Sequence, residues 1–256
     1  MCSMRRSVYY GIFFLLGAVL ASILVVTGIK FRKSLRRSRV ENGGYKENPE
    51  YYRCEKLFAA YPEAEKKIVM LGDSLTALCD WNEMLSRCDV ANRGISSDTS
   101  DGVLHRLEGV VGLQPEYCFL MIGINDLKSG ISPEIVYENI VKIVNLLNEK
   151  GIRVVIQTCL PVSGRWKNHE ALNLRVNGLN KLLEAFCDEN GMPLLNLTPF
   201  FMQNNTLNES LTYDGIHLKG AGYQIWAEQL NSYLRMATKS TKNHKKREPL
   251  INADVH

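Results

Sequence analysis

The sequence lacks several patterns that would assign the protein to other functional classes. Its seven cysteines form no C-x-x-C pair, and their odd number fits a reducing compartment better than a complete disulfide framework. Neither G-x-G-x-x-G nor G-x-x-x-x-G-K follows the first predicted strand, at 67–74. A flavin or nucleotide binder of this type would need such a glycine-rich loop to hold phosphate groups.

The sequence also lacks an excess of positive charge where a folded domain is expected. Residues 51–238 carry 17 Lys and Arg against 22 Asp and Glu, so the net charge of +4 comes from the two ends of the chain. A nucleic-acid-binding domain concentrates basic residues on its folded part, so no nucleic-acid partner is expected. Residues 239–256 have little apolar content and are predicted to be a disordered basic tail.

One long apolar segment stands near the start of the chain. Residues 8–29 contain 22 residues without a charge, and a helix needs about 20 such residues to cross the hydrocarbon core of a membrane. A cleaved signal peptide and a buried core helix are the alternatives. The segment is long for a signal sequence and no small-x-small cleavage site follows it, so we expect a retained single-pass anchor.

The side of the membrane on which the following domain lies stays open. Arg5 and Arg6 precede the span, whereas six basic residues lie within 30–39, and this excess of positive charge favours a cytoplasmic domain. The glycosylation sequons at Asn196, Asn204 and Asn208 point instead to a secretory lumen. We lean towards the cytoplasmic side.

The rest of the chain divides into a basic juxtamembrane segment and linker (30–60), one domain (61–238) and the tail. Short apolar segments, each typical of a strand buried on both faces, alternate in the domain with helical patterns over 132–150, 169–189 and 220–236. This alternation predicts an α/β fold with three layers, in which helices cover both faces of a five-stranded parallel sheet. The strand segments are 67–74, 88–95, 117–124, 153–160 and 192–198.

Parallel sheets place ligand sites at the carboxyl ends of their strands, and three polar candidates lie there. Gly72 allows a tight turn that exposes the hydroxyl of Ser74, at the start of a helix that favours negative charge. Gly94 ends the second strand and is expected to turn its N–H towards the same pocket, and Asn125 follows the third strand with a side-chain amide. Each residue taken alone is more often a helix cap, a loop glycine or a turn asparagine.

A fourth signal comes near the end of the domain. Asp214 and His217 lie three residues apart in a turn, where the carboxylate can bind one ring nitrogen and leave the other as a base. A serine, two hydrogen-bond donors and an Asp-x-x-His pair in this order form a complete set of groups for acyl transfer.

The order and the residue patterns of the four segments that contain Ser74, Gly94, Asn125 and His217 resemble those of the SGNH, or GDSL, hydrolase family. The resemblance spans residues 66–234 and is strongest to the branch that contains the platelet-activating-factor acetylhydrolase catalytic subunits. It differs from the G-x-S-x-G turn of α/β-hydrolases, because Thr76 replaces the second glycine. The segments most similar to that branch are Thr76–Trp81, Arg106-Leu107 and Leu160-Pro161.

The resemblance implies a flavodoxin-like fold and a serine esterase mechanism without a metal or an organic cofactor. Ser74 would be the nucleophile, His217 its base and Asp214 the residue that orients the histidine. The oxyanion hole would consist of the N–H groups of Ser74 and Gly94 and the side-chain amide of Asn125. Asp73 and Asp126 are interpreted as structural residues that cap a helix or brace a turn.

The sequence defines the substrate only as a small-molecule, carbohydrate or lipid ester. Short loops without a lid favour short acyl groups, such as acetyl groups on sugars. A membrane anchor would also bring the enzyme to lysophospholipids or lipid-derived thioesters, and Trp166 is a candidate aromatic contact. A catalytically silent binding module of the same fold is a further alternative. The sequence does not indicate an oligomeric state.

Overall fold

The computed structural model describes residues 45–61 and 65–245, with side chains up to residue 239. The predicted membrane span at 8–29, the start of the predicted linker and the end of the predicted tail lie outside these residues. Within the described part of the chain, every helix is too short or too polar to cross a membrane.

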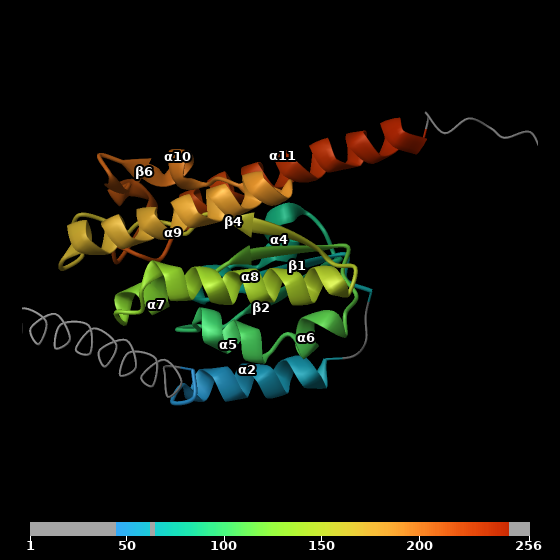
Figure 1. Ribbon diagram of the computed structural model, residues 1–256, viewed down its shortest axis with the longest axis horizontal. Coiled ribbons are helices and arrows are strands. Elements are labelled where there is room, and N and C mark those ends of the chain that lie inside the picture. Colours follow the sequence, from blue (N-terminus) through green and yellow to red (C-terminus); the bar gives the residue numbers. More distant parts are fainter. Residues whose placement is uncertain (1–44, 62–64, 246–256) are drawn as a thin grey trace, which may run out of the picture. The chain divides into compact units, whose positions relative to one another are not determined.

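The centre of the domain is a parallel sheet of five strands in the order β2-β1-β3-β4-β5 (Figure 1). This order is that of flavodoxin-like folds, and each strand lies within one of the five predicted segments. Every residue of β1 and β3 is buried, as expected for strands covered on both faces. The strands are β1 Ile68–Gly72, β2 Val90–Gly94, β3 Tyr117–Met121, β4 Arg153–Gln157 and β5 Leu194–Leu195.

Helices cover the two faces of the sheet and give the predicted three-layer α/β architecture. Successive side chains of β1 point to opposite layers, because side chains alternate along a strand. Val69 and Leu71 pack in the cluster that includes α8 and α9, and Ile68 and Met70 pack in the cluster that includes α4 and α11. The longer helices are α2 Pro49–Ala60, α8 Pro133–Glu149, α9 His169–Asn190 and α11 Gly220–Lys245.

Short elements fill the connections at the strand ends. A two-stranded antiparallel hairpin and a single 3-10 turn follow β5. These elements are α3 Ser74–Ala77, α4 Trp81–Leu85, α5 Ser100–His105, α6 Glu108–Val111, α7 Ile124–Lys128, α10 Thr198–Phe201, β6 Met202–Gln203, β7 Thr206–Leu207 and η1 Glu209–Leu211.

Two segments differ from the boundaries that the sequence suggested. Residues 49–60, assigned to the linker, form α2, which lies beside α5 and α6 (Figure 1). The helix buries Tyr51 and Cys54, which lie three residues apart on one helical face and pack with Ile95. At the other end, α11 continues beyond the predicted boundary at residue 236, through part of the predicted tail, to Lys245.

Candidate active site

Ser74 lies where β1 ends and α3 begins, at the carboxyl edge of the sheet. The turn is tight, because a Cβ atom on Gly72 would lie 2.3 Å from the carbonyl oxygen of Met121. Asp73 caps α3 by accepting a hydrogen bond of 3.0 Å from the N–H of Leu75. The N–H of Ser74 belongs to the first turn of the helix, where N–H groups have no acceptor within the helix.

His217 joins Ser74 from a loop 143 residues further along the chain. Its Nε2 atom lies 2.9 Å from Ser74 Oγ, and its Nδ1 atom lies 2.6 Å from Asp214 Oδ2. The second oxygen of Asp214 accepts hydrogen bonds from the N–H groups of Ile216 and His217, at 2.9 and 2.8 Å. The structure therefore brings the three predicted residues into one continuous hydrogen-bonded chain.

Asp214 is held in its ionised form by these contacts. Its partial burial acts to raise the pKa of the carboxyl group. The hydrogen bonds from the His217 ring and from the N–H groups of Ile216 and His217 outweigh this effect, and they hold the pKa below its ordinary value. The carboxylate therefore keeps the charge that would stabilise a protonated histidine ring.

Asn125 lies in α7, which directly follows β3. Its Nδ2 atom donates a hydrogen bond of 3.0 Å to the carbonyl oxygen of Asp98. An asparagine amide carries two N–H donors, so this contact fixes the orientation of the amide and leaves its second hydrogen for a ligand.

Gly94 does not offer the donor that the sequence suggested. Its N–H donates a hydrogen bond of 2.8 Å to Asn92 Oδ1 and is therefore already satisfied. The glycine is needed for close packing, because a Cβ atom at this position would lie 2.3 Å from the backbone nitrogen of Ala77 in α3. Gly94 thus lets β2 approach the helix that carries Ser74, and the structure removes its N–H from the predicted oxyanion hole.

Asn92 is a supporting residue that the sequence analysis did not identify. Besides accepting from Gly94, its side-chain nitrogen donates to the carbonyl oxygens of Thr76, Ala77 and Cys79, at 3.1, 3.3 and 3.0 Å. These contacts fix the chain that leaves α3. Its position at the carboxyl end of a strand was the signal that could have indicated such a role.

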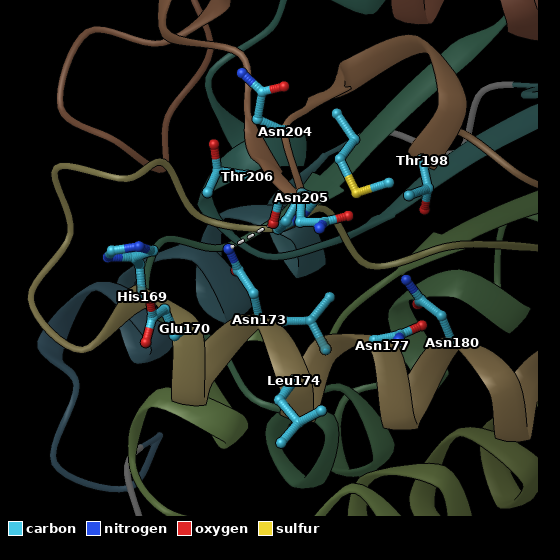
Figure 2. A pocket seen from close by; sticks show the side chains of 13 residues that line it. His169, Glu170, Asn173, Leu174, Asn177, Asn180, Thr198, Asn204, Asn205 and Thr206 are labelled. Atoms are coloured by element: carbon cyan, nitrogen blue, oxygen red, sulfur yellow. Dashed lines mark hydrogen bonds between the residues drawn. The ribbon is translucent and has the colours of Figure 1, made fainter.

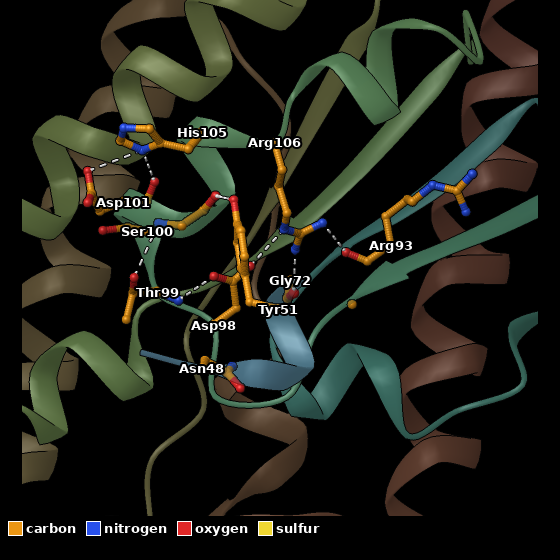
Figure 3. A network of polar contacts seen from close by, with 12 residues as sticks. Asn48, Tyr51, Gly72, Arg93, Asp98, Thr99, Ser100, Asp101, His105 and Arg106 are labelled. Atoms are coloured by element: carbon orange, nitrogen blue, oxygen red, sulfur yellow. Dashed lines mark hydrogen bonds and ion pairs between the residues drawn. The ribbon is translucent and has the colours of Figure 1, made fainter. Parts of the chain in front are cut away.

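A second supporting group, the Arg106 network, comprises the side chains of Arg106 and Asp98 and the carbonyl groups of Gly72 and Arg93 (Figure 3). Arg106 donates to Asp98 Oδ2 at 2.8 Å and to the carbonyl oxygens of Arg93 and Gly72, at 2.8 and 3.0 Å. Both charged side chains are at most 3% exposed. The network therefore links Gly72, two residues before Ser74, to Asp98, whose carbonyl oxygen accepts the hydrogen bond from Asn125.

Asp73 and Asp126 have the structural roles that the sequence predicted. Asp73 caps α3, and Asp126 accepts a hydrogen bond of 2.7 Å from Ser100 Oγ, which fixes α7 against α5. Complete burial raises the pKa of both carboxyl groups to about 7, because it disfavours their charged form.

Three side chains form the rim of the site, namely Lys128, Trp166 and Tyr213. Tyr213 is 56% exposed and stacks on the His217 ring with a centroid distance of 5.8 Å. The Lys128 ammonium group lies over the Trp166 ring, 5.3 Å from its centroid. Trp166 in turn lies beside Gly215, where an added Cβ atom would be 3.9 Å from the ring.

A separate cavity of about 530 Å³ lies between the first half of α9 and the hairpin formed by β6 and β7 (Figure 2). Its walls carry many amide side chains, whereas Ser74 and His217 do not line it. Within the described ranges, no cluster of three or more His, Cys, Asp or Glu side chains is arranged to hold a metal ion. The lining residues include Asn173, Asn177, Asn180, Asn204 and Asn205.

Comparison with known proteins identifies the class to which this fold and site belong. Residues 70–225 match the model of the GDSL-like lipase/acylhydrolase family. The chain therefore belongs to this family.

One curated acetylhydrolase and one solved lipase structure agree with this assignment, and a further relative has a name of another kind. The chain is 31% identical to the platelet-activating factor acetylhydrolase IB subunit alpha1 of Bos taurus over 67% of this chain and 76% of the relative. A GDSL-like lipase from Bacteroides thetaiotaomicron has a similar structure, with a TM-score of 0.66 and 26% identity over 73% of this chain and 98% of the other. An N-acylneuraminate cytidylyltransferase of Streptococcus agalactiae is 29% identical over 73% of this chain, which spans 44% of that relative's length.

Proposed function

We propose that the protein is a serine esterase in which Ser74 attacks the carbonyl carbon of a carboxylic ester. The observation that carries the proposal is the unbroken chain of contacts from Ser74 Oγ to His217 Nε2, at 2.9 Å, and from His217 Nδ1 to Asp214, at 2.6 Å. This is the geometry in which a histidine accepts the proton of a serine while a carboxylate holds the ring in the required tautomer.

The reaction proceeds in two halves. In the first, a bond forms between Ser74 Oγ and the acyl carbon while the serine proton moves to His217 Nε2. The ester C–O bond then breaks, and the alcohol leaves with that proton. In the second half, water attacks the acyl-enzyme, His217 takes a proton from the water, and the acid is released as the proton returns to Ser74.

The oxyanion that forms in each half needs hydrogen-bond donors. Ser74 and Asn125 both follow strands at the carboxyl edge of the sheet, which supports the N–H of Ser74 and the second amide hydrogen of Asn125 as these donors, whereas the N–H of Gly94 is bonded to Asn92. We therefore assign the oxyanion hole to Ser74 and Asn125. A donor of this kind is typically worth about 3–4 kcal/mol in the activation barrier.

The proposed substrates are esters of short acyl groups, above all O-acetyl groups. The short connections at the strand ends and the exposed rim support this choice, because they offer little enclosed surface for a long acyl chain. The name of the acetylhydrolase relatives agrees with it. A lysophospholipase or thioesterase acting on lipid-derived substrates is the second candidate, which the predicted anchor at 8–29 favours.

Two variants test how the roles are divided within the site. Asn125→Ala should still react with a fluorophosphonate probe, because the serine keeps its base, yet its turnover of a p-nitrophenyl ester should fall about 100-fold or more. Asp214→Asn should lose most of the probe labelling, because the amide favours the wrong histidine tautomer and removes the countercharge of the protonated ring. Equal loss of labelling in both folded variants would contradict this division.

Anchoring of the domain to a membrane through residues 8–29 is a further part of the proposal, with the domain on the cytoplasmic side. The support is the uncharged length of this segment and the basic residues that follow it. The full chain should stay with membranes after washing with high salt and alkaline carbonate. Release by either wash would contradict the anchor, and digestion of the domain by protease added outside intact cells would contradict its side.

A further inference from the structure

The rim of the active site carries a positive charge to which the proposed reaction assigns no role. Lys128 ends α7, three residues after Asn125, so the two side chains lie on the same face of this helix. The helix face that carries the Asn125 amide therefore also carries the ammonium group of Lys128.

One contact and one electrostatic effect relate this ammonium group to the active site. It lies 5.3 Å from the centroid of Trp166, whose ring lies beside Gly215, two residues before His217. Its charge also reaches Asp73, the neighbour of Ser74. Burial raises the pKa of that carboxyl group to about 7, and Lys128 acts in the opposite direction. Lys128 therefore packs on a ring that lies beside the histidine loop, and it follows Asn125 on α7.

The positive charge of Lys128 is not neutralised by the groups around it. Charged side chains near the rim are already paired, Arg165 with Glu209 and Asp214 with His217. Asp73 and Asp126 are completely buried and capped by hydrogen bonds within the domain. Among the described residues, no carboxylate lies within ion-pair distance of Lys128, and the side chain is exposed to solvent.

We infer that Lys128, held against the Trp166 ring, binds a negatively charged group on the alcohol part of the ester substrate. The inference rests on the proposed esterase function and specifies the class of substrate as acyl esters of an anionic alcohol. A carboxylate on an acetylated sugar acid and a phosphate on an acetylated glycerol share this chemistry. A charge-assisted hydrogen bond to such a group is stronger than a neutral one.

The test uses two pairs of substrates in which only one member carries the anionic group. One pair is an O-acetylated uronic acid and its methyl ester, and the other is acetylglycerol 3-phosphate and acetylglycerol. Release of acetate by the full-length protein gives kcat/KM for each substrate. The wild type should prefer the anionic member of at least one pair by about tenfold, and the pair that shows the preference identifies the source of the anion.

Three variants assign the preference to Lys128. Lys128→Gln should lose the preference while its kcat/KM on the neutral esters stays within about twofold, and Lys128→Arg should keep most of it. Lys150→Gln is the matched control, because Lys150 is exposed at the end of α8, near the opposite edge of the sheet where β4 begins. It should behave as the wild type. The preference should also decrease as salt is added, because ions screen an exposed charge.

The outcomes separate this inference from the proposed function. Ser74-dependent hydrolysis without a preference for charge, or a preference that survives in Lys128→Gln, overturns the role of Lys128 and leaves the esterase function standing. Hydrolysis that persists in Ser74→Ala overturns both.

Discussion

The two sides of the active site are built in different ways. On one side, the Arg106 network is buried and satisfies each of its charged groups through contacts within the domain. On the other side, the rim residues Lys128 and Tyr213 are exposed, and the nearby Arg165–Glu209 pair is about half exposed. The comparison indicates that the first side fixes the geometry of Ser74 and Asn125, whereas the second side is open to solvent and is the side on which we propose that the substrate binds.

Helix α2 strengthens the buried side. Asn48, which caps this helix, donates a hydrogen bond of 2.8 Å to the carbonyl oxygen of Ser96, and the Tyr51 hydroxyl donates one of 3.1 Å to that of Gly102. Arg93 stacks on Phe58 from the same helix, at 4.6 Å from the ring centroid. The turn that supports Asn125 is therefore fixed by residues outside the 66–234 segment in which the family resemblance was recognised.

The largest difference between the two sides should appear when one arginine is removed from each. Arg106→Met should lower the free energy of unfolding by about 3–5 kcal/mol, because it leaves Asp98 buried without its partner. Arg165→Met should cause no measurable change, since an ion pair at the surface contributes little. Denaturation in urea gives both values.

Arg106→Lys provides a second measurement if Arg106→Met does not fold. The lysine keeps the charge but cannot reproduce the three directed contacts of the guanidinium group, so its stability should lie between those of the wild type and Arg106→Met. Equal effects of the substitutions at 106 and 165 would contradict the distinction between the two sides.

A smaller effect on stability is expected when a single hydroxyl group of α2 is removed. Tyr51→Phe should destabilise the protein by about 1 kcal/mol, because the buried carbonyl oxygen of Gly102 loses its donor. Tyr52→Phe is a matched control on the next residue, whose exposed hydroxyl bonds to the carbonyl oxygen of Lys46. Thermal unfolding of the two variants should show a lower Tm for Tyr51→Phe alone. Equal Tm values would mean that α2 does not support the turn.

The sequence predicted the sheet well because strands buried on both faces leave a direct signal. Each of the five strands lies in a short apolar segment, and the three predicted helices begin within one residue of their observed starts. The ends of α8 and α9 were also close, because Gly151 and Gly191 adopt positive φ angles there. By contrast, α2 buries only two residues of a largely polar segment, which gives too weak a periodicity to distinguish it from a linker.

The candidate site was predicted in part for a similar reason. Ser74 and Asn125 follow parallel strands, so they had to meet at one edge of the sheet, and the spacing of Asp214 and His217 predicted their contact. The error at Gly94 has another origin. The direction of its N–H depends on the Asn92 side chain, and its need for glycine depends on Ala77, 17 positions earlier. Neither contact leaves a periodic pattern in the sequence, because the first depends on the conformation of one side chain and the second joins residues that are distant along the chain.

The most direct test of the account is the labelling of Ser74 by a fluorophosphonate probe, which reacts with an activated serine whatever the natural substrate is. The full-length protein should be labelled at Ser74, as mapped by mass spectrometry of its peptides, and Ser74→Ala should show no labelling while its circular dichroism spectrum stays unchanged. Labelling at another residue, or equal labelling of the folded Ser74→Ala variant, would contradict the assignment of Ser74 as the nucleophile.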